Sequence, residues 1–199
     1  QNISHRQSFT STIGVGIYIV ILISLFGLYL YTYRRKLLDS LRHVLFFTIL
    51  MAMLICAAFL VLRHFSASYI FLIPFAWVPI ITRVFYDSRT AIFIHIITVF
   101  IVSIAAPAPY VFILLQVITG IVAVISLRDM TQRAQLAQTA LFTFLMYSVV
   151  YTASTLLVTG SIANVEYNYY IYFAVNAVLV ICAYGLIFLF ERTFGLVSN

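Results

Sequence analysis

Seven long apolar stretches occupy most of this 199-residue chain, and short basic or polar segments separate them. Inside lipid, backbone amides have no water to bond, so only helices and closed barrels cross a bilayer. The stretches are continuous apolar runs without strand-like alternation, which is typical of helices. The sequence therefore predicts an all-α polytopic membrane protein, a bundle of seven transmembrane helices.

The composition leaves room for little else. The chain is 64% hydrophobic and 8% charged, whereas about a quarter of the residues of a soluble domain are charged. A bilayer core of about 30 Å needs about 20 residues per helix, so seven helices use nearly the whole length. We expect them at residues 13–33, 43–62, 69–82, 90–105, 110–127, 139–158 and 169–190.

The predicted helices divide the chain into three parts. Residues 1–12 are expected to be an extracytoplasmic tail, the end of an outer domain. Residues 13–191 form the seven-helix transmembrane domain, and residues 192–199 begin a linker to a cytoplasmic domain. A polar connection is expected at residues 128–138.

Basic residues are distributed unevenly between the two ends of the helices. Alternate connections hold nine of the eleven Lys and Arg residues: Arg34, Arg35, Lys36, Arg42, Arg83, Arg89, Arg128, Arg133 and Arg192. Only Arg6 and Arg63 lie on the opposite side. Because cytoplasmic loops are enriched in basic residues, the N-terminus is predicted outside and the C-terminus in the cytoplasm. The net charge of +6 sits at helix ends, which argues against nucleic-acid binding.

Three polar residues lie inside predicted membrane helices: His95, Gln116 and Asn176. With Tyr151, from a hydroxyl-rich helix, they are candidates to line one ligand pocket. Interhelical hydrogen bonding is the more common role of such residues and stays the alternative. No Asp or Glu falls in mid-membrane, which argues against an ion-coupled transporter.

The third and fourth helices meet at a charged turn. Pro74 and Pro79 precede it, and each predicts a bend because proline lacks a backbone donor. Arg83, Asp87 and Arg89 are expected to form the turn by charge pairing and N-capping at the cytoplasmic face, with Asp87 or Ser88 near the start of the fourth helix. A docking surface for a cytoplasmic partner is the alternative.

Motifs of catalysis and metal binding are missing from the sequence. There is no HExxH, GxSxG, Walker loop or CxxC. Cys56 and Cys182 fall singly in apolar helices, where neither a disulfide nor a metal site is implied. We therefore expect no catalytic residue, metal ligand or cofactor in this segment.

Two segments resemble the membrane domain of the 7TM-HD family of bacterial proteins. The first is IPFAWVPIITRVFYDSRTAIFIHI at Ile73–Ile96, and the second is LFERTFGLVSN at Leu189–Asn199. The "IP" and "D-x-R-x-A" elements match Ile73, Pro74, Asp87, Arg89 and Ala91. The "E-x-x-FG" exit from the last helix matches Glu191, Phe194 and Gly195.

The resemblance implies an outer sensor domain before the helices and a cytoplasmic HD phosphohydrolase domain after them. It implies hydrolysis of cyclic di-AMP, with metal ions held by His and Asp of that HD domain, none of which lies in this chain. The expected partners are membrane lipid and the protein's own outer and HD domains, in the bacterial cytoplasmic membrane.

Our leading hypothesis is a signalling domain whose last helix couples to the HD domain. The coupling residues would be Glu191, Arg192, Phe194 and Gly195, with Gly195 as a helix stop or swivel. A small-molecule transporter or channel and a passive membrane anchor are the alternatives. Homodimerisation is left open, because Gly14, Gly16 and Gly27 give no GxxxG pair.

Overall fold

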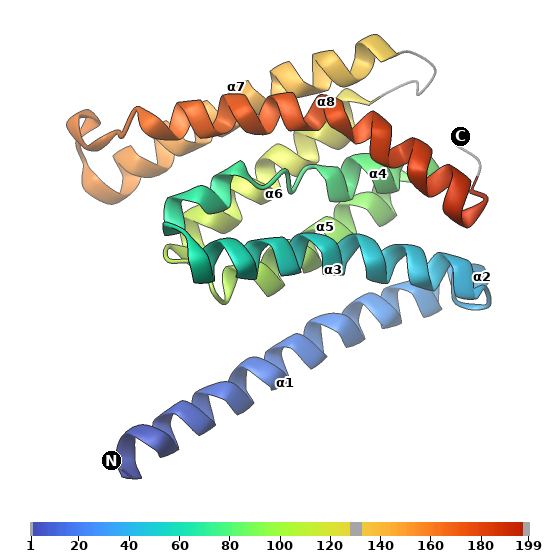
Figure 1. Cartoon of the computed structure of the whole chain (residues 1–199), viewed down its shortest axis with the longest axis horizontal. Helices are drawn as coiled ribbons and strands as arrows, with labels where there is room; N and C mark the ends of the chain where they lie inside the picture. Colours follow the sequence, from blue (N-terminus) through green and yellow to red (C-terminus); the bar gives the residue numbers. More distant parts are fainter. Residues whose placement is uncertain (1, 128–132, 197–199) are drawn as a thin grey trace. The chain divides into compact units, whose positions relative to one another are not determined.

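The computed structural model describes residues 2–127 and 133–196, and every regular element in these ranges is a helix (Figure 1). The elements are α1 Asn2–Tyr33, α2 Arg35–Leu38, α3 Leu41–His64, η1 Ala67–Leu72, α4 Trp77–Phe85, α5 Ser88–Ser103, α6 Pro109–Ser126, α7 Arg133–Thr159, η2 Ile162–Asn164 and α8 Asn168–Phe194. The chain divides into two compact units, residues 1–44 and 45–199.

The smaller unit is dominated by α1. Its end at Tyr33 confirms the predicted end of the first span, and a guanidinium–ring contact lies there, with Arg35 Cζ 5.2 Å from the centre of the Tyr31 ring. Its beginning differs, because the helix starts at Asn2 and not at Ile13, so residues 2–12 of the expected tail are helical, and their place outside the membrane stays a prediction. No glycine or proline interrupts this polar stretch, so it continues the apolar helix that follows.

Six helical segments are long and apolar enough to cross a bilayer. They are Thr10–Tyr33, Leu41–His64, Ala67–Phe85, Pro109–Ser126, Gln135–Thr159 and Asn168–Phe194. The remaining apolar stretch forms α5, which has 16 residues and is therefore about 24 Å long. Ten of these side chains are buried. A helix that is mostly covered by protein does not have to match the thickness of the lipid.

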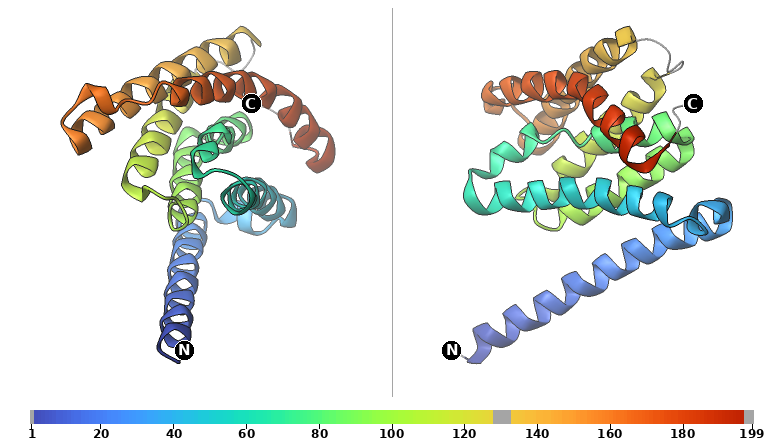
Figure 2. Two further views of the ribbon diagram at one scale, coloured as in Figure 1. Left: turned by 60° about the vertical axis from the view of Figure 1, so that its left-hand side comes forward. Right: turned by 45° about the vertical axis from the view of Figure 1, so that its right-hand side comes forward.

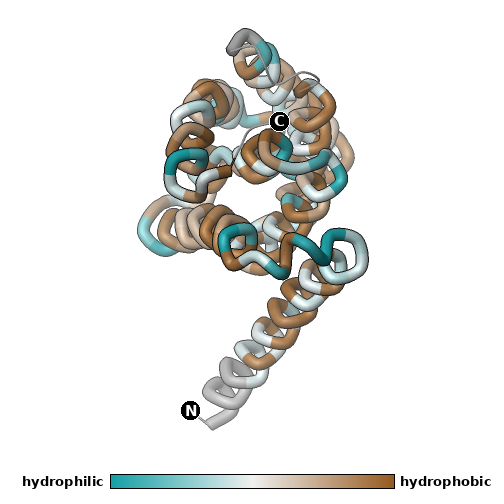
Figure 3. Tube along the Cα trace, turned by 90° about the vertical axis from the view of Figure 1, so that its right-hand side faces the viewer, coloured by the Kyte–Doolittle hydropathy of each residue, from teal (hydrophilic) through white to brown (hydrophobic). Residues whose placement is uncertain are grey.

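Large apolar side chains also cover the outside of these helices. Leu157 is 75% exposed, Val178 60% and Phe188 59%. Figure 3 shows hydrophobic colours running along the helices and hydrophilic colours at their ends and connections. Such a surface is a liability in water and suits contact with lipid chains. The chain is therefore a multi-pass membrane protein.

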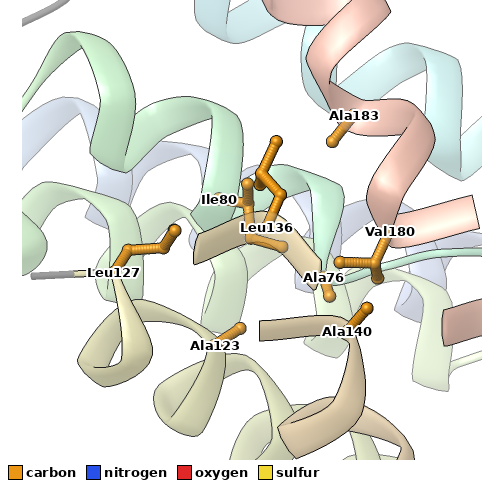
Figure 4. Packing of buried hydrophobic residues seen from close by; sticks show 8 residues of the cluster. All are labelled: Ala76, Ile80, Ala123, Leu127, Leu136, Ala140, Val180 and Ala183. Atoms are coloured by element: carbon orange, nitrogen blue, oxygen red, sulfur yellow. The ribbon is translucent and has the colours of Figure 1, made fainter. Parts of the chain in front are cut away.

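In the larger unit, consecutive helices from α4 to α8 pack as neighbours, and α8 also packs on η1 and α4 (Figure 2). A core of mostly small side chains joins α4, α6, α7 and α8 (Figure 4). It consists of Ala76, Ile80, Ala123, Leu127, Leu136, Ala140, Val180 and Ala183. Alanine at a helix crossing lets the backbones approach closely, which is how membrane helices gain packing contacts.

The third predicted helix, at residues 69–82, is interrupted where we expected a bend. Pro74 follows η1, and Ile73 before it is extended at φ −72° and ψ 124°. Proline disfavours helical geometry in the preceding residue and donates no backbone hydrogen bond, so the helix stops. Pro79 lies in the first turn of α4, where a missing donor costs little.

The last two long helices extend beyond their predicted bounds. α7 begins at Arg133, so residues 133–138 of the expected polar connection are helical, and 128–132 lie outside the described residues. α8 continues past the predicted end at Phe190 to Phe194, so Arg192 lies in the helix. Gly195 then adopts φ 62° and ψ 30°, the left-handed geometry that ends helices, which confirms it as the helix stop.

Candidate functional site

The buried side chains of α8 form one stripe along the whole helix. They recur every three or four residues: Phe173, Asn176, Val180, Ala183, Ile187 and Phe190. Residues at this spacing lie on one helix face. Val178 and Phe188, on other faces, are exposed. We call these six residues the α8 stripe, and the other parts of the site are arranged along it.

Asn176 of the stripe fixes the interrupted helix to α8. Its Nδ2 donates to the carbonyl oxygens of Phe71 and Ile73 at 3.0 and 2.9 Å, where η1 ends. In the opposite direction, Trp77 Nε1 donates to the carbonyl oxygen of Leu179 at 2.8 Å. An unsatisfied carbonyl in the membrane costs several kcal/mol, so these bonds compensate for the break.

A second set of buried polar groups joins α5, α6 and α7. His95 Nε2 lies 2.8 Å from the carbonyl oxygen of Gln116, which can only accept, so Nε2 carries the proton. Tyr147 donates its hydroxyl to Gln116 Oε1 at 2.6 Å and stacks on Phe173 at 5.2 Å. A β-carbon on Gly120 would collide with the His95 imidazole. We call His95, Gln116, Gly120, Tyr147 and Asn176 the sealed interior.

At the C-terminal end of α8, aromatic rings surround Phe46 of α3. The centre of the Phe46 ring lies 5.3 Å from Phe47, 5.5 Å from Phe85, 5.4 Å from Tyr86, 5.2 Å from Phe190 and 6.1 Å from Phe194. Ring pairs at such distances add stabilisation beyond their buried area. This aromatic cluster, these six residues, joins the end of α8 to α3 and to the end of α4.

The charged turn is attached to the same cluster. Asp87 is the N-cap residue of α5, as predicted, and its Oδ1 accepts from the Thr90 hydroxyl at 2.6 Å. Arg83 Nη1 donates to the carbonyl oxygen of Tyr86, a cluster residue, at 3.4 Å, and Arg89 is exposed. The turn and the coupling residue Phe194, predicted separately, thus share one packing centre.

At the other end of α8 lies a cleft of about 380 Å³. It is lined by Ala67, Ser68, Ile70, Phe71, Ala106, Pro107, Ala108, Val111, Phe112, Tyr151, Ser154, Thr155, Val158, Thr159 and Tyr169. Tyr151 stacks on Tyr169 with ring centres 4.7 Å apart, and its hydroxyl accepts from the Glu166 backbone N–H at 3.3 Å. Apolar walls with several hydroxyls are typical of small-molecule sites.

The four residues predicted for one ligand pocket do not line one cleft in the structure, although His95 and Gln116 are bonded to each other. Tyr151 lines the cleft. His95, Gln116 and Asn176 are at most 1% exposed, and each makes a hydrogen bond between helices. For these three the structure describes the interhelical bonding that was our alternative. Within residues 2–127 and 133–196, no three His, Cys, Asp or Glu side chains gather as a metal site.

The α8 stripe and the role of Phe46 were missed from the sequence. In this part of the chain every helix face is apolar, so an ordinary hydrophobic pattern does not separate a buried face from a lipid-facing one. The sequence signal for the buried face was the pair Asn176 and Ala183, which are seven residues apart. Membrane helices contact each other through polar and small residues of this kind.

One of the comparisons with known proteins identifies a family. A family model described as "7TM receptor with intracellular HD hydrolase" matches residues 9–198. Neither the curated proteins nor the solved structures contain a match to the chain. The family match spans nearly all of the sequence and includes both segments, Ile73–Ile96 and Leu189–Asn199, on which the resemblance was based. The chain therefore belongs to the family of 7TM receptors with an intracellular HD hydrolase.

Proposed function

We propose that this chain is the transmembrane signalling domain of a cyclic di-AMP phosphodiesterase in the bacterial cytoplasmic membrane, and that α8 relays its signal to a cytoplasmic HD domain. Membership of a receptor family supports a membrane sensory role. The substrate and the route through α8 are our proposal. The metal ions of hydrolysis would belong to the HD domain.

We further propose seven crossings, with the N-terminus outside and the C-terminus in the cytoplasm. The nine-to-two division of basic residues supports this orientation. α5 would be the crossing added to the six longer segments. It would be shorter than the others because its neighbours shield it from lipid. Reporter fusions at the two ends test the topology. Activity of both reporters on the same face of the membrane would refute it.

The observation that carries the relay is the continuity of the α8 stripe. The stripe touches the interrupted helix through Asn176 and the sealed interior through Phe173. It ends at Phe190 in the aromatic cluster, five residues before the Gly195 stop. A shift at the cleft end therefore alters packing along the helix. A signal would act by favouring one of two arrangements of these contacts.

A register insertion in α8 tests the relay in the full-length protein. One alanine inserted after Phe190 turns the following residues by about 100° and removes Phe194 from Phe46. Seven inserted residues make nearly two full turns and restore the face, which provides the matched control. We expect the single insertion to change cyclic di-AMP hydrolysis severalfold and the seven-residue insertion to change it less. Unchanged hydrolysis and response after the single insertion would favour a passive anchor.

The two native cysteines allow a second test without knowledge of the signal. Cys56 on α3 and Cys182 on α8 are both exposed and can carry spin labels. Coupling between sites is reciprocal, so a substrate analogue bound to the HD domain must bias the membrane helices. We expect a non-hydrolysable cyclic di-AMP analogue to shift the distance distribution between the two labels. An identical distribution with and without the analogue would contradict coupling through α8.

A further inference from the structure

We infer that the cleft binds a small uncharged amphiphile, with an apolar body and one hydrogen-bonding group. Its volume of about 380 Å³ lies within the range of small-molecule sites, about 300 to 1,000 Å³. The walls come from η1, the α5–α6 connection, the ends of α6 and α7, and Tyr169 of α8. Binding stands by itself, whereas its role as the signal input rests on the proposed function.

The charge distribution around the cleft selects against ions. All of its lining residues are uncharged, and an ion that enters such a site loses hydration without gaining a partner. Glu166 is the only charged residue between Thr139 and Phe190 in the sequence, and it is exposed. Its backbone N–H bonds to Tyr151, so an acidic group lies beside the cleft and disfavours anions.

One hydroxyl of the wall is available to a ligand. Ser154 is 2% exposed and lines the cleft, and its Oγ makes no hydrogen bond within the described part of the chain. Other hydroxyls are engaged: Ser68 Oγ lies 3.2 Å from Tyr169 Oη, and Thr159 donates to the Thr155 carbonyl at 2.7 Å. Because this hydroxyl lines the cleft and is not bonded to another part of the chain, Ser154 is the expected anchor for the ligand's polar group.

The apolar body would lie against aromatic rings that lead to α8. The Phe71 ring lies 6.3 Å from Phe112 and 5.4 Å from Tyr169. Tyr169 is four residues before Phe173, the first residue of the α8 stripe, and therefore on the same face. A ligand that fills the cleft would contact the Phe71–Tyr169 ring pair at the start of this face of α8. This contact connects binding to the relay.

Photolabelling of the full-length protein in lipid nanodiscs tests the site. The probe is 1-octanol carrying a diazirine, with labelled peptides mapped by mass spectrometry. We expect labels on the cleft walls, competition by excess 1-octanol and no competition by octanoate, the anion of the same length. Ala67→Phe, which fills the cleft, should lower labelling at least tenfold. Ser154→Ala, which keeps the space, should weaken competition by 1-octanol about fivefold.

Two variants on α7 are matched controls. Leu157→Phe adds a ring on the lipid-facing side, where Leu157 is 75% exposed. Ser148→Ala removes a hydroxyl that donates to the Phe144 carbonyl, away from the cleft. Both should leave labelling of the cleft unchanged. Equal competition by octanoate, or labelling indifferent to both Ala67→Phe and Ser154→Ala, would overturn the inference.

A second probe distinguishes the source of the ligand. The same diazirine on the acyl chain of a phospholipid labels the cleft if bilayer lipid fills it. Labelling by the alcohol and not by the phospholipid supports the inference, whereas labelling by the phospholipid alone, or by neither probe, refutes it. Because this experiment measures labelling and not hydrolysis, absence of labelling refutes the binding site without contradicting the α8 relay. If the cleft is labelled but the single-alanine insertion in α8 leaves hydrolysis unchanged, the relay is refuted and the binding site stands.

Discussion

Tyr147 and Tyr151 lie one turn apart on α7, yet they belong to two differently built regions. Tyr147 is 1% exposed, and its hydroxyl makes a 2.6 Å bond to Gln116 inside the sealed interior. Tyr151 is 8% exposed, faces the cleft and accepts a longer bond of 3.3 Å from the Glu166 backbone. The same type of side chain thus connects two helices by a hydrogen bond in one region and lines an open cleft in the other.

The difference between these regions lies in the space around the polar groups. In the sealed interior, His95 and Gln116 are buried, and the His95 ring lies directly against Gly120. In the cleft, apolar walls with several hydroxyls enclose about 380 Å³. Substitutions should therefore reduce stability strongly in the sealed interior and weakly in the cleft, in the following order.

The largest effect is expected for Gly120→Ala. The new β-carbon would collide with the His95 ring, which is buried and bonded to Gln116 and so has nowhere to move. We expect a loss of about 3 kcal/mol in the free energy of unfolding, measured by denaturation in detergent. Gly185→Ala on α8 is the control, since no atom lies within 4 Å of its β-carbon. An equal effect of both substitutions would contradict the sealed packing.

Asn176→Ala should have the next largest effect. It leaves the carbonyl oxygens of Phe71 and Ile73 without the donor that they share in the interrupted helix. We expect destabilisation of about 2 kcal/mol, because both carbonyl oxygens would lose the Asn176 donor and Ile73 would keep only the bond from the Phe75 N–H. Asn168→Ala, at the exposed start of the same helix, should change the melting temperature little. Wild-type stability of Asn176→Ala would show that the break does not need this amide.

Tyr147→Phe should cost about 1 kcal/mol. It removes a single hydroxyl and leaves Gln116 Oε1 without that donor, and hydrogen bonds between membrane helices are individually modest. The matched control is Tyr110→Phe, at the start of α6, where the side chain is 63% exposed. If Tyr147→Phe lowered the melting temperature no more than Tyr110→Phe does, the Tyr147 hydroxyl would not stabilise the sealed interior.

Tyr151→Phe should have the smallest effect on stability, within about 0.5 kcal/mol. The ring keeps its stacking on Tyr169, and the lost hydroxyl bond is long. The measurement is the same melting curve, compared directly with Tyr147→Phe. If Tyr151→Phe were the more damaging of the two, the distinction between the cleft and the sealed interior would be wrong.

The candidate site could be predicted from the sequence only in part. Asp87 as the start of α5 and Gly195 as the stop of α8 follow from local chemistry, and both were identified correctly. The grouping of His95, Gln116, Asn176 and Tyr151 did not follow, because polarity within a span does not say which neighbour a side chain meets. Asn176 bonds to a carbonyl 105 residues away, where Pro74 interrupts a helix.

By itself, the sequence determined the helical membrane class, the approximate spans and the family. These features follow from one local requirement, that each backbone amide in lipid be bonded within its own segment. Only the tertiary structure decided that the third helix is interrupted, that Phe46 gathers the end of α8 with the charged turn, and that the cleft opens beside Tyr151. These features depend on which apolar faces meet, and in a chain apolar on nearly every face, packing alone makes that choice.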